Sequence, residues 1–185
     1  MLEEWGPLAG LAGIWEGDRG LDVAYSHANN AVSETRFRER ASFSTFGPVE
    51  NGAQVLYGLD YRTAAWRPGE DLPFHTEVGY WLWDASTSTV MRCFMVPRGV
   101  TLLAGGTAPA NARSLTMSAE CGSETFGILS NPYLAAGPAR TVRYTCTVTL
   151  GDDGSLSYEE TTTIEMEKLG GEYAHTDRNT LYRVE

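Results

Sequence analysis

The sequence contains little cysteine: three residues in 185, at Cys93, Cys121 and Cys146. The number is odd and no two are spaced as C-x-x-C, which argues against a disulfide framework and against a zinc site. Each cysteine lies in a strand-like segment, so we interpret all three as small buried apolar residues. Cysteines of this kind indicate a reducing, cytoplasmic compartment.

The sequence also lacks an excess of positive charge and any long apolar run. It has 14 Lys and Arg residues against 24 Asp and Glu residues, and a net charge of -10. No basic stripe is available to pair with phosphates, so we expect neither nucleic acid nor an anionic membrane surface as a partner. No segment has the length of a transmembrane span, and residues 1–13 do not have the pattern of a signal peptide. We therefore expect no membrane insertion.

The sequence does contain short segments in which apolar and polar residues alternate. In residues 139–150, for example, Val142, Tyr144, Cys146 and Val148 share one face of a predicted strand. Turns rich in Gly, Pro, Asn and Asp separate the segments, and no sustained helical period occurs. We predict one all-β domain over residues 1–185, a single antiparallel β-barrel of about ten strands with one or two short helical turns. A barrel of this size has room inside for a ligand.

Three motifs together resemble one protein family. They are Leu11-Ala-Gly-Ile-Trp-Glu-Gly17, Leu72-Pro-Phe-His-Thr-Glu-Val-Gly-Tyr-Trp81 and Val96-Pro-Arg-Gly-Val100. Their order and spacing are similar to those of the nitrobindins, and the resemblance covers nearly the whole chain. It implies a lipocalin-like barrel with the fold of fatty-acid-binding proteins. Within the first motif, Trp15 is expected to fill one end of that barrel.

The nitrobindin resemblance implies a heme b whose iron is ligated by a histidine in the last strand, and the candidate here is His175. The spacing from His175 to Leu181 is longer than the family pattern by about one residue, and such a slip turns a strand side chain to the other face. The chain therefore also resembles a branch that keeps the barrel and lacks the heme-ligating histidine. In that case His175 is a cavity residue paired with Asn179 or Asp177, or a hydrogen-bonded residue at a strand end with no function.

Other residues could line a ligand cavity. His75 could lie at its mouth, although a histidine held by Glu77 after a proline turn is the more common structure. Trp66 and Tyr80 belong to a group of aromatic residues that suits a flat apolar ligand. Arg183 is a candidate anchor for an acidic head group because it shares the face of His175.

Two further charged residues are placed by the same alternation. Arg143 lies opposite the apolar residues of its strand and is expected to point outward, whereas Glu160 is expected to point inward and to pair with an arginine. No G-x-S-x-G, H-E-x-x-H or phosphate-loop motif occurs, so we assign no catalytic residues.

Three functions remain. The first is binding of a small hydrophobic or amphipathic ligand, such as a lipid-like acid, by a monomer or homodimer without a cofactor. The second, implied by the resemblance, is a ferric heme protein that binds nitric oxide and isomerises peroxynitrite to nitrate, with His175 as axial ligand. The third is an interaction module with a filled interior. We favour a binding protein over an enzyme.

Overall fold

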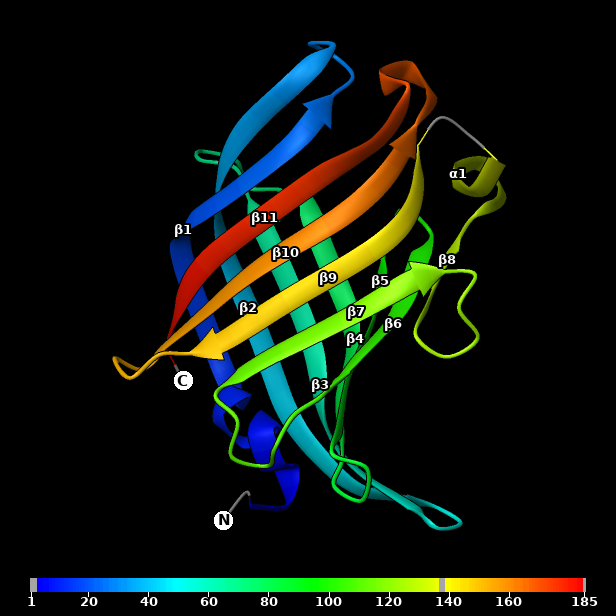
Figure 1. Cartoon of the computed structure of the whole chain (residues 1–185). Helices are drawn as coiled ribbons and strands as arrows, with labels where there is room; N and C mark the ends of the chain where they lie inside the picture. The colour runs from blue at the N-terminus through cyan, green and yellow to red at the C-terminus, as the bar shows by residue number, and fades with distance from the viewer. Residues whose placement is uncertain (1–2, 137–138, 185) are drawn as a thin grey trace.

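The computed structural model describes residues 3–136 and 139–184, and strands make up most of them (Figure 1). The helical segments are short: η1 (Glu3–Leu11), α1 (Pro132–Ala136) and η2 (Glu167–Leu169). No helix among these residues is long and apolar enough to cross a membrane. The strands are β1 (Gly13–Ser26), β2 (Ala31–Asn51), β3 (Gln54–Trp66), β4 (His75–Asp84), β5 (Thr89–Val96), β6 (Val100–Thr107), β7 (Ser114–Cys121), β8 (Gly127–Ser130), β9 (Arg140–Leu150), β10 (Ser155–Met166) and β11 (Gly171–Arg183).

These strands form one closed barrel in the order β1-β11-β10-β9-β7-β8-β6-β5-β4-β3-β2, and β1 pairs with both β2 and β11 to complete it. The predicted all-β barrel is confirmed. Two details differ: the described residues form eleven strands, and β8 runs parallel to β7 in an otherwise antiparallel sheet. The four residues of β8 are too few to show alternation in the sequence.

The alternation of apolar and polar residues predicts which side chains enter the barrel. Tyr144 and Cys146 of β9 are completely buried, as is Leu59 of β3. The prediction that all the cysteines are buried is wrong, because Cys121 is exposed and Cys93 is only half-buried. Both of these lie at outward-facing positions of their strands, where a small residue meets solvent.

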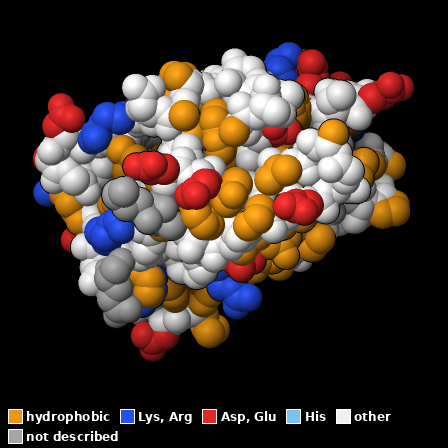
Figure 2. All heavy atoms as spheres, turned by 90° about the horizontal axis from the view of Figure 1, so that it is seen from below, with side chains coloured by type: hydrophobic (Ala, Val, Ile, Leu, Met, Phe, Trp, Pro, Cys, Tyr) orange, Lys and Arg blue, Asp and Glu red, His pale blue; other side chains and the backbone are white. Residues whose placement is uncertain are grey.

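One end of the barrel is closed by η1 and the first residues of β1. Leu8 and Leu11 of η1 are buried there beside Trp15, whose indole Nε1 donates a hydrogen bond to the Leu11 carbonyl at 2.7 Å. The Arg183 guanidinium lies 4.7 Å from the centre of the Trp15 ring. Trp15 therefore fills this end, as predicted. Figure 2, which views the molecule from this side, shows side chains covering the end.

Both described ends of the chain lie at this closed end. The Val184 backbone N–H donates a hydrogen bond to the Ile14 carbonyl, and the Arg183 side chain donates one from Nη2 to the Gly10 carbonyl. The opposite end carries α1, the β1–β2 and β10–β11 hairpins, and the loop between β3 and β4 (Figure 1). The interior is therefore approached from that opposite end.

Candidate functional site

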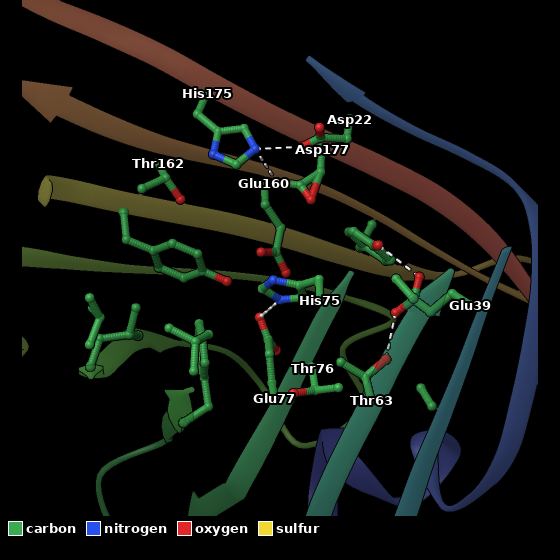
Figure 3. Close-up of a pocket in the computed structure, with 18 of the residues that line it drawn as sticks. Asp22, Glu39, Thr63, His75, Thr76, Glu77, Glu160, Thr162, His175 and Asp177 are labelled. Carbon is green, nitrogen blue, oxygen red and sulfur yellow. Dashed lines mark hydrogen bonds and ion pairs between the residues drawn. The ribbon is translucent and has the colours of Figure 1, made fainter. Parts of the chain in front are cut away.

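A cavity of about 450 Å³ occupies the barrel and reaches the end opposite η1. Its volume falls in the range of small-molecule sites. Apolar side chains from most strands line it. On the side of β5, β6 and α1 they are Phe94, Val96, Val100, Leu102 and Leu134, which we call the apolar wall. The polar wall includes Asp22, Glu39, His75, Glu77, Arg92, Tyr158, Glu160, His175 and Asp177, and Figure 3 labels all of these except Arg92 and Tyr158.

Arg92 is the cation at the base of the polar wall. It is 3% exposed, because its position on β5 between Val90 and Phe94 faces the interior. Its Nη2 donates to Glu77 Oε2 at 2.7 Å, and its Nη1 donates to a carboxylate oxygen of Glu160. Burial of an arginine is tolerated only when such partners compensate its charge. The predicted pairing of Glu160 with an arginine is confirmed. The sequence analysis did not identify Arg92, although it alternates with Val90 and Phe94 in the sequence and so shares their inner face.

Two tyrosines also bond to Arg92, whose Nε has no hydrogen-bond partner among the described residues. Tyr61 accepts from Nη2 at 3.1 Å and donates to Glu77 at 2.8 Å, while Tyr144 accepts from Nη1. Burial raises the pKa of both phenols well above its usual value, even though the charge of Arg92 acts in the other direction. Both side chains therefore stay neutral and act as hydrogen-bonding groups.

A row of three carboxylates crosses the polar wall. Asp22 on β1 stands directly opposite Asp177 on β11, and Asp177 stands directly opposite Glu160 on β10. Like charges in directly opposed positions of neighbouring strands destabilise a sheet. Burial, followed by the charge of Glu160, raises the pKa of Asp177 to about 7. The middle carboxyl of the row therefore holds a proton in part of the molecules at neutral pH.

His175 lies next to this row. Its Nε2 is 2.5 Å from Asp22 Oδ1 and 3.7 Å from Asp177 Oδ2 (Figure 3). Burial acts to lower the pKa of His175, but the hydrogen bond to Asp22 and the charge of Asp177 outweigh it and raise the pKa. The imidazolium form is therefore favoured. Of the two partners predicted for His175, Asp177 is near it and Asn179 is not.

Asn179 instead belongs to a buried cluster around Glu39. It donates to Glu39 Oε2 at 3.0 Å, and Tyr158 donates to the same oxygen at 2.8 Å. Thr63 donates to Oε1 at 2.9 Å. Burial raises the pKa of Glu39 despite these bonds. Asn179 thus holds Glu39 in place by a hydrogen bond and does not itself line the cavity.

His75, the first residue of β4, lines the cavity and its side chain is 44% exposed. Its Nε2 is 3.1 Å from Glu77 Oε1, which is the pairing expected from the sequence. Burial acts to lower the pKa of His75, but the hydrogen bond and charge of Glu77 raise it to about 9. In Glu77, burial acts upward, while Arg92 and His75 together lower the pKa to about 2. The pair is therefore ionic at neutral pH.

Besides Asn179, three of the predicted cavity residues lie elsewhere. Trp66 and Tyr80 are at outward-facing positions of β3 and β4, next to the inward-facing Ala65 and Trp81. Trp66 packs under Arg38 on the outer surface, and Arg183 covers Trp15 at the closed end. The structure therefore brings only His75 and His175 of the six predicted residues to the cavity surface.

Comparison with known proteins assigns the fold to a family. Residues 4–183 match the model of the THAP4-like, heme-binding beta-barrel domain. The chain belongs to this family. No curated protein matches the chain. Among solved structures, the crystal structure of Rv2717c from M. tuberculosis is similar with a TM-score of 0.67 and 18% identity, over 96% of this chain and 95% of that chain. At that identity the likeness shows the fold alone.

The polar wall of this THAP4-like barrel does not fit a heme. Nε2 of His175 lies between two carboxylates, so a porphyrin would have to displace both to bring its iron to that nitrogen. The other ring nitrogen lies on the side of Thr162, the cross-strand neighbour of His175 (Figure 3). His75 is held by Glu77 in the same way. Because a heme brings two carboxylates of its own, a wall that already holds five is a poor site for it.

Proposed function

We propose that this member of the family binds a small amphipathic molecule in the barrel, with its apolar part on the wall formed by β5, β6 and α1. The observation that supports this most is the 450 Å³ cavity with one apolar and one polar wall. Burial of apolar ligand surface against Phe94 and Leu102 would provide most of the affinity, and the polar wall would set the orientation.

The polar end of this ligand is a hydrogen-bond donor, such as an amine or a hydroxyl. Carboxylates dominate the wall, and an ionised carboxylate only accepts hydrogen bonds. Arg92 is already paired with Glu77 and Glu160, so it offers little to a ligand acid. Both bonds accepted by Glu160 go to Oε1, and among the described residues none goes to Oε2. Glu160 Oε2 is therefore the acceptor that we assign to the ligand. A lipid-like acid, which the sequence led us to consider, is not supported by this wall.

Displacement of the fluorescent probe N-phenyl-1-naphthylamine tests this function. Dodecylamine and dodecanol should displace the probe more effectively than dodecanoate, because the acid places a further negative charge beside Glu160. Glu160→Gln should reduce the preference for the amine over the acid. The matched control is Glu165→Gln, on the same strand but exposed and paired with Arg140. A preference for dodecanoate in the unchanged protein would refute the proposed polar end.

Addition of hemin tests the alternative. We expect no Soret band that depends on His175. A band that appears with the unchanged protein and is lost in His175→Ala would show that the carboxylates beside the ring do move aside for a porphyrin, and the amphipathic ligand would then be the wrong occupant.

A further inference from the structure

The three carboxylates of the row have only two cationic partners among the described residues. Glu160 is paired with Arg92, and Asp22 is paired with His175. Asp177, in the middle of the row, accepts no hydrogen bond among the described residues, and its nearest cationic group there is the same His175 at 3.7 Å. One imidazole thus faces two carboxylates that lie directly opposite each other across β1 and β11. A partly buried pair of carboxylates is stabilised by a proton on one of them or by a second positive charge.

The donor atoms of these residues converge. One oxygen of Asp22, one oxygen of Asp177 and a ring nitrogen of His175 all lie within 4.8 Å of one another. They belong to two neighbouring strands, since His175 and Asp177 are two residues apart on β11 and so share its inner face. Rigid strands rather than loops therefore hold the three groups, and all three line the cavity.

We propose that Asp22, His175 and Asp177 form a binding site for a divalent transition-metal cation, with Zn²⁺ as the best match. With neutral imidazole and two carboxylates, a divalent ion brings the charge of the group to zero. Imidazole nitrogen and carboxylate oxygen are both zinc ligands, whereas Mg²⁺ and Ca²⁺ prefer oxygen alone. Three protein ligands leave a fourth position, which here faces the cavity and would be open to water or to a ligand.

The carboxylates that block a heme iron from His175 Nε2 do not block a free ion. A porphyrin has to reach one nitrogen past both carboxylates, while a free cation uses the carboxylates as ligands. Glu160, the acceptor proposed for the amphipathic ligand, stands next to Asp177 across β10 and β11 but is not one of the three metal ligands. Variants of Glu160 and of the three ligands therefore test the two sites separately.

Isothermal titration of the full chain, freed of metal with a chelator, measures the site with Zn²⁺ as the probe. We expect saturable binding of one ion. His175→Gln and Asp177→Asn should each weaken it roughly 10-fold or more, the size of effect seen when a metal site is perturbed. The matched control is His27→Gln, because His27 is exposed and its ring lies against Tyr25. Anomalous scattering at the zinc edge from a soaked crystal should place the ion among the three side chains.

Zn²⁺ binding that is equal in the unchanged protein and in both variants, or absent altogether, would overturn the proposal. If a variant fails to fold, the anomalous map of the unchanged protein still decides the question. The probe-displacement experiments are run with chelator present, so loss of the metal proposal leaves their outcome intact. Conversely, Zn²⁺ binding without any displacement of the probe would reject only the amphipathic ligand.

Discussion

At the scale of single residues, Arg92 has the most partners in the interior. It is buried between two carboxylates and two phenols, and its guanidinium lies 4.5 Å from the centre of the Phe94 ring. Such a group adds little net stability compared with apolar packing, but removal of one member leaves the others uncompensated. Arg92 is therefore a residue whose loss should be costly.

We predict that Arg92→Met lowers the free energy of unfolding by about 3–5 kcal/mol, because Glu77 and Glu160 lose their buried counter-ion. Urea denaturation at neutral pH measures this. Arg143→Met is the control, because the Arg143–Glu172 pair is exposed and should contribute no more than about 1 kcal/mol. Equal losses in the two variants would show that the buried network does not depend on its cation.

The His75–Glu77 pair predicts a dependence of stability on pH. The folded-state pKa of His75, about 9, lies above its ordinary value of 6.5, so its contribution is complete below pH 6.5 and is lost as the pH rises through about 9. The folded-state pKa of Glu77, about 2, lies below 4.5, so its contribution is complete above pH 4.5 and is lost as the pH falls through about 2.

We therefore expect the difference in stability between the unchanged protein and His75→Gln to be largest between pH 4.5 and 6.5 and to shrink toward pH 10. Denaturation across this range measures the difference, and the proton NMR titration of the imidazole gives the pKa directly. An imidazole that titrates at or below 6.5 would contradict the ionic pairing with Glu77.

At the scale of strands, glycine permits two neighbouring strands to approach. A Cβ on Gly79 of β4 would lie 2.0 Å from the Cys93 carbonyl oxygen and 2.7 Å from the Phe94 Cα of β5. These are backbone atoms of a paired strand, so they cannot move without disturbing the ladder. Gly79 is thus required by the pairing of β4 with β5, which carry Glu77 and Arg92.

We predict that Gly79→Ala destabilises the protein by about 1–3 kcal/mol, the usual cost of forcing extra volume into a packed site. Gly171→Ala is the control, because a Cβ there meets nothing within 4 Å, and it should change stability by no more than about 0.5 kcal/mol. Thermal denaturation of both variants gives the comparison. Retention of full stability by Gly79→Ala would mean that β4 and β5 separate more easily than their register indicates.

The strands also show what could be predicted from the sequence. The barrel of short strands with few helical turns follows from the alternation of apolar and polar residues and from the absence of a helical period. Alternation also placed Glu160 inside, but it was not applied to Tyr80, whose neighbour Trp81 takes the inner face. The carboxylate row could not be predicted, because the register between β1, β11 and β10 depends on closure of the barrel.

At the scale of the whole molecule, the cavity should make stability depend on ligand. A ligand at about 100 times its dissociation constant adds about 2.7 kcal/mol, or roughly 5–10 °C in the melting temperature of a domain of this size. We predict this shift with dodecylamine in the unchanged protein. Val100→Trp, which fills the cavity from the apolar wall, should abolish the shift.

The matched control for Val100→Trp is Leu129→Trp on the neighbouring β8. Leu129 is 71% exposed, so a tryptophan there adds the same ring outside the cavity and should leave the shift unchanged. Differential scanning calorimetry measures all three proteins. A shift that persists in Val100→Trp would place the bound amine outside the barrel.

The arrangement of the two described ends of the chain has a practical consequence. Glu3 and Val184 both lie on the side closed by η1, away from the opening into the barrel. An affinity tag, a fluorescent fusion or a sensor chip can therefore be attached through either terminus without obstructing entry. Tethering in this orientation would let captured molecules be exchanged in flow, which makes the barrel suitable for immobilised screening of candidate compounds.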